Sequence, residues 1–356
     1  MKRRKLRIIV LLVLMAVVSC DEPDTIVTNI VHNDGSVTRK IVMRYSNKGL
    51  KKSDIQVPFN NTWTVTDSLE VGVKGDTIWI KRAEKLFKNV DEINSGYKND
   101  SSTNGKIPRK AYFSKRFRWF NTEYRFSEII DKQIPDGYSI TDFLNEEELK
   151  YFYSPDYIKF NKENGADSIK YKAYSDSLNK KTSHWTMKNI ASMWIKEFSR
   201  LTAGNNEPGL SESSLKAHED HIIKVIEETK TDFDSLWKNG VILKEFIGEK
   251  DAVKFKTEGD SALDLAVKKC LFDFISYSER IVMPGKLTGT NGYIDSTRNL
   301  LWPVISDFFM TDNYEMWAES KTTNIWAWIF SGVFLVFVST GIVIKRRSRR
   351  VAGPKP

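Results

Sequence analysis

The spacing of hydrophobic and polar residues changes several times along the chain. Apolar runs without a charge cover residues 8–18 and 325–344. Between them, residues 25–126 contain segments in which apolar and polar positions alternate, as in strands with one buried face. From about residue 140 apolar residues recur every three or four positions, as on a helical face, and strand-like segments return from 284 to 320. The pattern predicts an α+β fold, with a helical block inserted between early and late strands of antiparallel β structure.

The predicted β-rich region, residues 20–138, begins with a hairpin over residues 25–45. Asn33-Asp34-Gly35 supplies the turn, and Val37 and Ile41 lie on one face of the second strand. Residues 62–66 and 77–80 are further strand candidates, and 83–93 is a helix candidate.

The most aromatic stretch, residues 111–126, changes phase in its middle. Apolar residues occupy odd positions up to Trp119 and even positions from Phe120 onward. Because strand faces alternate with period two, this change requires a bulge or turn near residues 119–121. Interleaved arginines here are also typical of a platform for single-stranded nucleic acid. We favour the solvated faces of a core hairpin.

The predicted helical region covers residues 139–281. Asn145 and Glu148 have the spacing of a capping box that opens a short helix to Tyr153. Apolar stripes predict further helices from about residue 185, over 211–237, and from Ser261.

Residues 282–322 are predicted to form membrane-proximal strands over 286–290, 300–305 and 314–320. Turn residues Pro284-Gly285 and Asn291-Gly292 flank the first of these. The stretch 283–292, together with Trp302, resembles a membrane-proximal module of uncharacterised bacterial lipoproteins. This resemblance covers about a tenth of the chain and implies no activity.

The first twenty residues have the pattern of a secretory signal. A basic start precedes the apolar run, which at 11 residues is too short to span a bilayer, and Val17-Val18-Ser19-Cys20 ends the segment. These four residues resemble the lipobox of bacterial lipoproteins. The resemblance implies cleavage of residues 1–19 and attachment of lipid, such as palmitate, to Cys20. Asp21 after the cysteine resembles an inner-membrane retention signal in some lipoproteins, and an acidic run there resembles a surface-export signal in others.

The second apolar run predicts one transmembrane helix over residues 323–344. Trp326 and Trp328 lie at its start, as aromatic residues do at the lipid–water boundary. A basic tail follows over residues 345–356, beginning Lys345-Arg346-Arg347, and basic blocks of this kind stay cytoplasmic. Because outer-membrane spans are closed barrels, we expect the bacterial inner membrane, with a periplasmic ectodomain and a cytoplasmic C-terminus.

Two anchors of this kind would require both ends of the ectodomain to reach one leaflet. We therefore expect Asp24 and Lys321 to lie close together, with the first hairpin near the strands of residues 284–320.

The charge distribution argues against a nucleic-acid partner. The chain carries a formal net charge of +9, from 55 basic and 46 acidic residues. Five basic residues lie in the first seven positions and six lie from Lys345 onward, which leaves 44 basic residues against 46 acidic ones in the body. A near-neutral body of mixed charge has no basic footprint for nucleic acid.

Candidate chemistry is sparse. Cys270 lies on an apolar helical face, which favours a buried inert thiol. His218 and His221 share a helical face beside Glu219 and Asp220, so they are candidate metal ligands, although a partly buried helical histidine is the preferred interpretation of His218. No cofactor and no catalytic residue is predicted.

Two functions then compete. The first is a non-enzymatic interaction or accessory module of an envelope complex, tethered to the membrane and bound to a protein partner. The second is a membrane-tethered, metal-dependent hydrolase that uses His218 and His221. The absence of a recognisable catalytic set in the sequence favours the interaction module.

Overall fold

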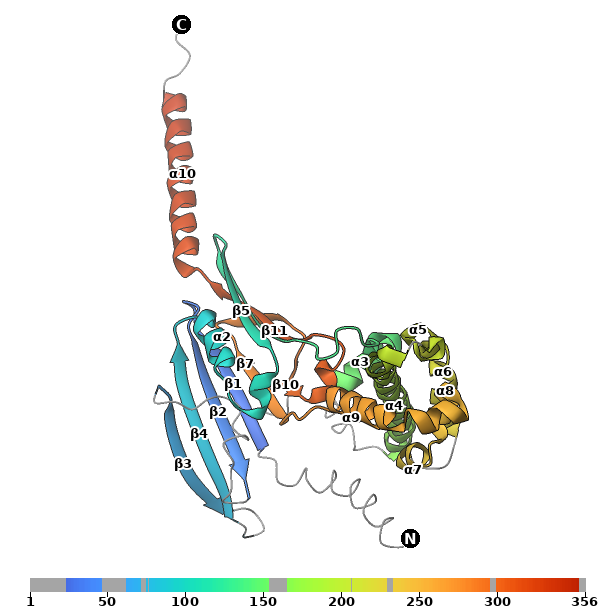
Figure 1. The fold of residues 1–356 in the computed structure, drawn as a ribbon. Coiled ribbons are helices and arrows are strands. Elements are labelled where there is room, and N and C mark those ends of the chain that lie inside the picture. The colour runs from blue at the N-terminus through green and yellow to red at the C-terminus, as the bar shows by residue number, and fades with distance from the viewer. Residues whose placement is uncertain are drawn as a thin grey trace.

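The computed structural model describes residues 24–46, 62–71, 75, 77–153, 165–205, 207–228, 233–294 and 299–351. These residues form two β-sheets, a helical block and one separate C-terminal helix (Figure 1). The fold is α+β with mostly antiparallel sheets and an inserted helical block, as the sequence predicts. The predicted signal peptide, residues 1–19, and the predicted lipid-attachment residue Cys20 lie outside the described ranges.

The larger sheet has seven strands in the order β3-β4-β2-β1-β7-β10-β9. In that order the strands are β3 (Thr64–Val71), β4 (Thr77–Phe87), β2 (Val37–Tyr45), β1 (Asp24–Val31), β7 (Tyr277–Val282), β10 (Leu300–Val304) and β9 (Tyr293–Ile294). Strands β1 and β7 pair in parallel, and the other neighbours are antiparallel. The parallel pair joins the two β-rich parts of the chain in one sheet.

The smaller sheet has four antiparallel strands in the order β5-β6-β11-β8. They are β5 (Arg109–Phe117), β6 (Asn121–Ile130), β11 (Tyr314–Thr323) and β8 (Lys286–Thr290). Residues 118–120 connect β5 to β6, so the phase change in the aromatic stretch is a hairpin turn, as predicted. The inward faces of both sheets contribute to one hydrophobic core that includes Val37, Ile41 and Phe126.

Helix α2 (Val90–Lys98) packs beside β5, and the side chain of Asn94 forms hydrogen bonds with the backbone of that edge strand. The Asn94 amide donates to the Ala111 carbonyl at 3.0 Å, and the Asn94 side-chain oxygen accepts from the Ala111 N–H at 2.7 Å. The residues predicted as one helix over 83–93 divide between the end of β4 and the start of α2.

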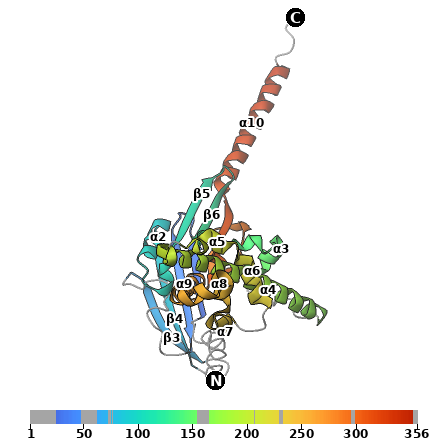
Figure 2. The same ribbon diagram turned by 45° about the vertical axis from the view of Figure 1, so that its right-hand side comes forward.

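The helical block runs from residue 146 to residue 270 and lies to one side of the sheets (Figures 1 and 2). Its helices are α3 (Glu146–Tyr153), α4 (Gly165–Thr202), α5 (Glu212–Lys216), α6 (Glu219–Glu228), α7 (Phe233–Lys238), α8 (Val241–Lys254) and α9 (Lys256–Cys270). Short 3-10 helices cover Thr103–Lys106, Ile140–Asp142, Ala203–Asn205, Pro208–Leu210 and Ser306–Phe309. A second core lies between α4 and α5–α9, centred on Trp194 and Phe198.

Several predicted helix bounds differ from those observed. Helix α4 starts twenty residues before residue 185, and the single helix predicted over 211–237 is three short helices. Strand β7 lies inside the range predicted as helical, because the helices end at Cys270. The predicted capping box of α3 is confirmed, since Asn145 accepts from the Glu148 N–H at 2.9 Å and Glu148 accepts from the Asn145 N–H at 3.0 Å.

Helix α10 (Ile325–Val351) projects away from both sheets and from the helical block (Figure 1). Residues Ile325–Arg347 are long and apolar enough to cross a membrane, and nearly all of this segment is exposed. In a helix that contacts the body only through its first two turns, such a surface fits a lipid environment.

The expectation that Asp24 and Lys321 lie close together is wrong. The turn of the β1–β2 hairpin contacts β5, where Lys115 donates to the Asn33 carbonyl, and β5 continues from there to the base of α10. Strand β1 starts at the opposite end of the hairpin, opposite Arg44, whereas β11 ends at α10. The turn, rather than the start of β1, therefore lies toward the C-terminal helix.

Candidate functional site

A groove of about 580 Å³ lies between α3, the turn that joins β8 to β9, and the start of β11. Its volume is within the range of ligand-binding clefts. The groove is lined by Glu146, Leu149, Lys150, Tyr153, Asn291, Gly292, Tyr293, Trp302, Pro303, Asn313, Tyr314 and Glu315. Three segments that are far apart in the sequence thus meet around one opening.

Asn291 fixes the floor of the groove. Its side-chain oxygen accepts hydrogen bonds from the Trp302 indole at 3.0 Å and from the Trp317 N–H at 2.9 Å, and its amide donates to the Glu315 carbonyl at 2.6 Å. A Cβ at Gly292 would lie 2.5 Å from the Trp302 ring, so glycine is required there. The Asn291–Gly292 turn and Trp302 therefore form one structural unit.

Stacked aromatic rings form one wall. Tyr153 and Tyr314 stack with ring centroids 5.7 Å apart, and Phe308 packs against both rings. The Tyr314 hydroxyl donates to the Pro303 carbonyl at 2.9 Å. Burial, together with the smaller effect of the nearby Asp312, raises the pKa of Tyr153 to about 12. These rings form a rigid wall that stays uncharged at neutral pH.

Charged side chains of both signs, Glu146, Lys150 and Glu315, lie among the lining residues. Among the described residues that line the groove there is no serine, threonine, cysteine or histidine. Aromatic rings with a few charged groups are typical of surfaces that hold a protein segment. The arrangement is suited to binding.

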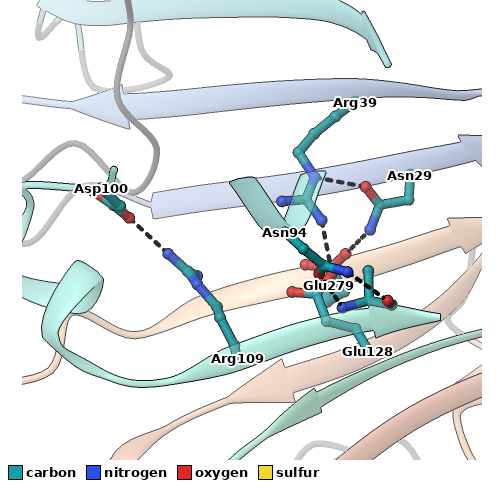
Figure 3. Close-up of polar contacts among 8 residues, drawn as sticks. Asn29, Arg39, Asn94, Asp100, Arg109, Glu128 and Glu279 are labelled. Carbon is teal, nitrogen blue, oxygen red and sulfur yellow. Dashed lines mark hydrogen bonds and ion pairs between the residues drawn. The ribbon is translucent and has the colours of Figure 1, made fainter. Parts of the chain in front are cut away.

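A buried polar cluster connects the two sheets (Figure 3). Arg39 of β2 forms an ion pair with Glu128 of β6 at 2.7 Å and donates to the Asn29 side chain at 2.7 Å. The Asn29 amide donates in turn to Glu279 of β7. All four side chains are buried, so the cluster is a fixed internal contact between sheets.

A second ion pair joins Arg109 of β5 to Asp100 at 2.7 Å (Figure 3). The Tyr97 ring lies near both guanidinium groups, with its centroid 5.0 Å from Arg39 and 4.4 Å from Arg109. Burial raises the pKa of Glu279 well above its ordinary value, and the neighbouring Glu128 raises it further, against the opposing effect of Arg39. Glu279 is therefore the carboxyl of the cluster that favours the neutral form.

The structure places the predicted membrane-anchoring residues on α10. Trp326 and Trp328 are more than half exposed at its start, and Lys345, Arg346 and Arg347 are exposed near its end. Both tryptophans contact the turn between β5 and β6. The predicted lipid-attachment residue, Cys20, is outside the described residues.

The two candidate metal ligands have separate partners. His218 is exposed in the turn between α5 and α6, so its interpretation as a partly buried helical histidine is wrong. Its ring donates to the Ser214 carbonyl at 3.1 Å, whereas the His221 ring lies 3.3 Å from a Glu245 oxygen. Glu219 is buried and accepts from the Tyr138 hydroxyl. Within the described ranges, no group of three or more His, Cys, Asp or Glu residues is placed to hold a metal ion. No observation therefore favours the metal-dependent hydrolase.

Cys270 is buried at the end of α9, as predicted. Burial raises the pKa of its thiol to about 12. At neutral pH the thiol is protonated, and the protonated form is a poor nucleophile.

Comparison of the chain with protein-family models, with curated proteins and with solved structures finds no match in any of the three.

Proposed function

We propose that the protein is a membrane-anchored interaction module whose groove binds a segment of a partner protein outside the cytoplasm. The groove is the observation that carries the proposal, because rigid aromatic rings line an open cleft of about 580 Å³. Tyrosine and tryptophan supply much of the binding energy in protein interfaces. The partner belongs, on this proposal, to an envelope complex.

Helix α10 is the proposed anchor in a bacterial inner membrane. An exposed apolar helix followed by Lys345, Arg346 and Arg347 supports a span with its C-terminus in the cytoplasm. The sheets and the helical block then lie on the periplasmic side. Strand β11 is ten residues long, so the groove at its first residues lies about 30 Å along the strand from the start of α10.

Lipid on Cys20 is a separate proposal, which rests on the resemblance to a lipobox. Four residues from Cys20 to Asp24 reach at most about 14 Å, whereas β1 alone is about 23 Å long. Because β1 starts at the end of the hairpin away from α10, the fold does not bring the two proposed anchors together. Lipidation thus requires its own test.

Photo-crosslinking in intact membranes tests the groove. We expect p-benzoylphenylalanine at Lys150, an exposed groove residue, to give one discrete crosslinked product. Lys250 is an equally exposed lysine on α8, outside the groove, and serves as the matched control. Identical products from both positions, or none from Lys150, would contradict the proposal.

Sedimentation tests the two anchors. A chain that ends at Asn324 should remain with membranes if Cys20 carries lipid, and the Cys20→Ser form of that shortened chain should be released. Release of the shortened chain with Cys20 intact would remove the lipid proposal and leave α10 as the anchor.

A further inference from the structure

The turn between β5 and β6 packs against the first two turns of α10. Phe117 stacks on Trp326 with centroids 6.3 Å apart, and Phe120 contacts Trp328 at 4.3 Å. Trp119 contacts Trp326 at 5.3 Å. We call the three hairpin residues Phe117, Trp119 and Phe120 the aromatic tip.

Asn324 fixes the junction between β11 and α10 to this turn. Its N–H donates to the Phe120 carbonyl at 2.9 Å, and its side-chain amide donates to the carbonyls of Arg118 at 2.7 Å and Trp119 at 3.2 Å. Its side-chain oxygen accepts from the Thr122 hydroxyl at 3.0 Å. Four hydrogen bonds from one residue restrict the angle between helix and body.

The aromatic tip remains exposed despite these contacts. Phe117 is 57%, Trp119 is 46% and Phe120 is 39% exposed. Large apolar side chains gathered at one exposed point usually mark an interaction surface. The partner of this surface must lie where α10 begins.

The position of the tip along α10 indicates the kind of partner. The Trp119 indole donates to the Ser331 hydroxyl at 2.9 Å. Ser331 is six residues beyond Ile325, which is about 9 Å along the helix axis. The tip therefore lies beside the first part of the apolar segment, at the level that aromatic side chains occupy at a membrane interface.

We propose that the aromatic tip inserts into the interfacial layer of the same bilayer that holds α10. The proposal rests on the membrane span proposed for α10. The tip and the aromatic start of the helix then form one continuous lipid-facing surface. With Asn324 restricting the junction, two membrane contacts hold the body in one orientation on the bilayer, so that the groove has a constant height and direction.

Fluorescence quenching in vesicles tests the insertion. The full chain with Cys20→Ser is labelled with NBD at Arg118→Cys in the tip, at Val333→Cys in α10, or at Arg82→Cys on β4, and is reconstituted in phosphatidylcholine and phosphatidylglycerol. Arg82 is the matched control, because Arg118 and Arg82 have 46% and 43% exposed side chains and each has one glutamate partner in an ion pair. Buried Cys270 is protected from the label.

We expect lipids with a shallow doxyl group to quench the probe at residue 118 and to leave the probe at residue 82 unquenched. Quenching at residue 333 without quenching at residue 118 would overturn the insertion and leave the membrane span intact. A probe at residue 118 that is shielded from water but not quenched by lipid would indicate a protein partner and would also overturn it. Loss of quenching at residue 333 would refute the span itself.

Two variants separate the tip from the junction. Replacing Trp119 and Phe120 by serine should abolish lipid quenching at residue 118 while quenching at residue 333 persists; unchanged quenching at 118 would contradict a role for the rings.

Asn324→Ala should broaden the distance distribution between spin labels at residues 82 and 333. Asn205→Ala, in the helical block, should leave the distribution narrow, and a narrow distribution in Asn324→Ala would refute the role of the junction.

Discussion

Four buried polar residues occupy positions that their strands otherwise give to apolar side chains. Asn29 alternates with Val27 and Val31, and Arg39 alternates with Val37 and Ile41. Glu128 on β6 and Glu279 on β7 also occupy buried positions of the alternating pattern of their strands. The alternation alone thus indicates which polar residues face inward, because strand faces have period two. It does not indicate their partners, which come from strands far apart in the sequence.

Replacing either glutamate of this cluster by glutamine should change the free energy of unfolding by different amounts. Glu128→Gln breaks the buried ion pair with Arg39 and should lower the free energy of unfolding by about 3 kcal/mol, the low end for such a loss, since Glu279 can ionise in its place. Glu279→Gln should not lower it to a comparable extent at pH 7, because a neutral amide replaces a carboxyl that favours its neutral form. Urea unfolding of both variants in detergent measures the difference, and equal losses would contradict the assignment of the charge to Glu128.

The pH dependence of Glu279→Gln follows from the raised pKa of Glu279. Below the ordinary value of 4.5 both the folded and the unfolded chain carry a neutral Glu279. As the pH rises from there toward the raised folded pKa, the unfolded state ionises first, so wild-type stability falls. The stability of Glu279→Gln relative to wild type should therefore increase between pH 4 and pH 7. A stability difference between Glu279→Gln and wild type that does not vary with pH would contradict a raised pKa of Glu279.

At the scale of elements, local signals predicted turns better than helix lengths. The phase change near Trp119 requires a turn, and the structure has one at residues 118–120. By contrast, the stripe from Met187 to Leu201 marks the part of α4 that packs on the second core, and the helix continues well before it. Hydrophobic periodicity detects buried faces, so it underestimates a helix that extends beyond its contacts.

Strand β7 shows why long-range pairing was missed. Its six residues contain two charged side chains, Glu279 and Arg280, and start seven positions after the end of α9 at Cys270. The strand is stabilised by pairing with β1, about 250 positions earlier, and with β10. The groove could not be predicted from the sequence for the same reason. Asn291, Gly292 and Trp302 are visible in the sequence, but the approach of α3 is a tertiary contact.

Gly285 fixes the turn that brings β8 onto β11. Its φ is 76°, and a Cβ there would lie 2.4 Å from the Lys321 carbonyl oxygen. A left-handed conformation costs an L-residue about 1–2 kcal/mol. Gly285→Ala should lower the free energy of unfolding by more than this amount, because the added Cβ also meets the Lys321 carbonyl oxygen. Gly240 has a φ of 72° with no atom within 4 Å of a Cβ, so Gly240→Ala is the matched control for the conformation alone. Thermal unfolding of both variants in detergent should show the larger loss for Gly285→Ala, and equal losses would exclude the steric effect.

At the scale of the whole molecule, two cores share one helix. Trp185 of α4 packs in the core with the sheets, whereas Trp194 and Phe198 pack among α5–α9. Ile190 and Met193 contact both cores. Because the two cores share few residues, we expect the core around Trp194 to open without separating the sheets.

Hydrogen exchange tests this independence. Trp194→Ala removes a buried ring that stacks on Phe198 and contacts Phe246, which should cost about 3–5 kcal/mol. We expect faster amide exchange in α6, α8 and α9, with β2 and β6 unchanged. Uniform acceleration in helices and strands would show that the two cores unfold as one unit.

The central place of β11 in its sheet also has a mechanical consequence. The strand has β6 on one side and β8 on the other, with ten paired positions along β6, and it leads directly into α10 through Asn324. Ladder hydrogen bonds lie perpendicular to antiparallel strands. A pull transmitted along β11 therefore loads these bonds together in shear instead of opening them one at a time. The sheet should therefore resist, as a unit, a pull applied through α10.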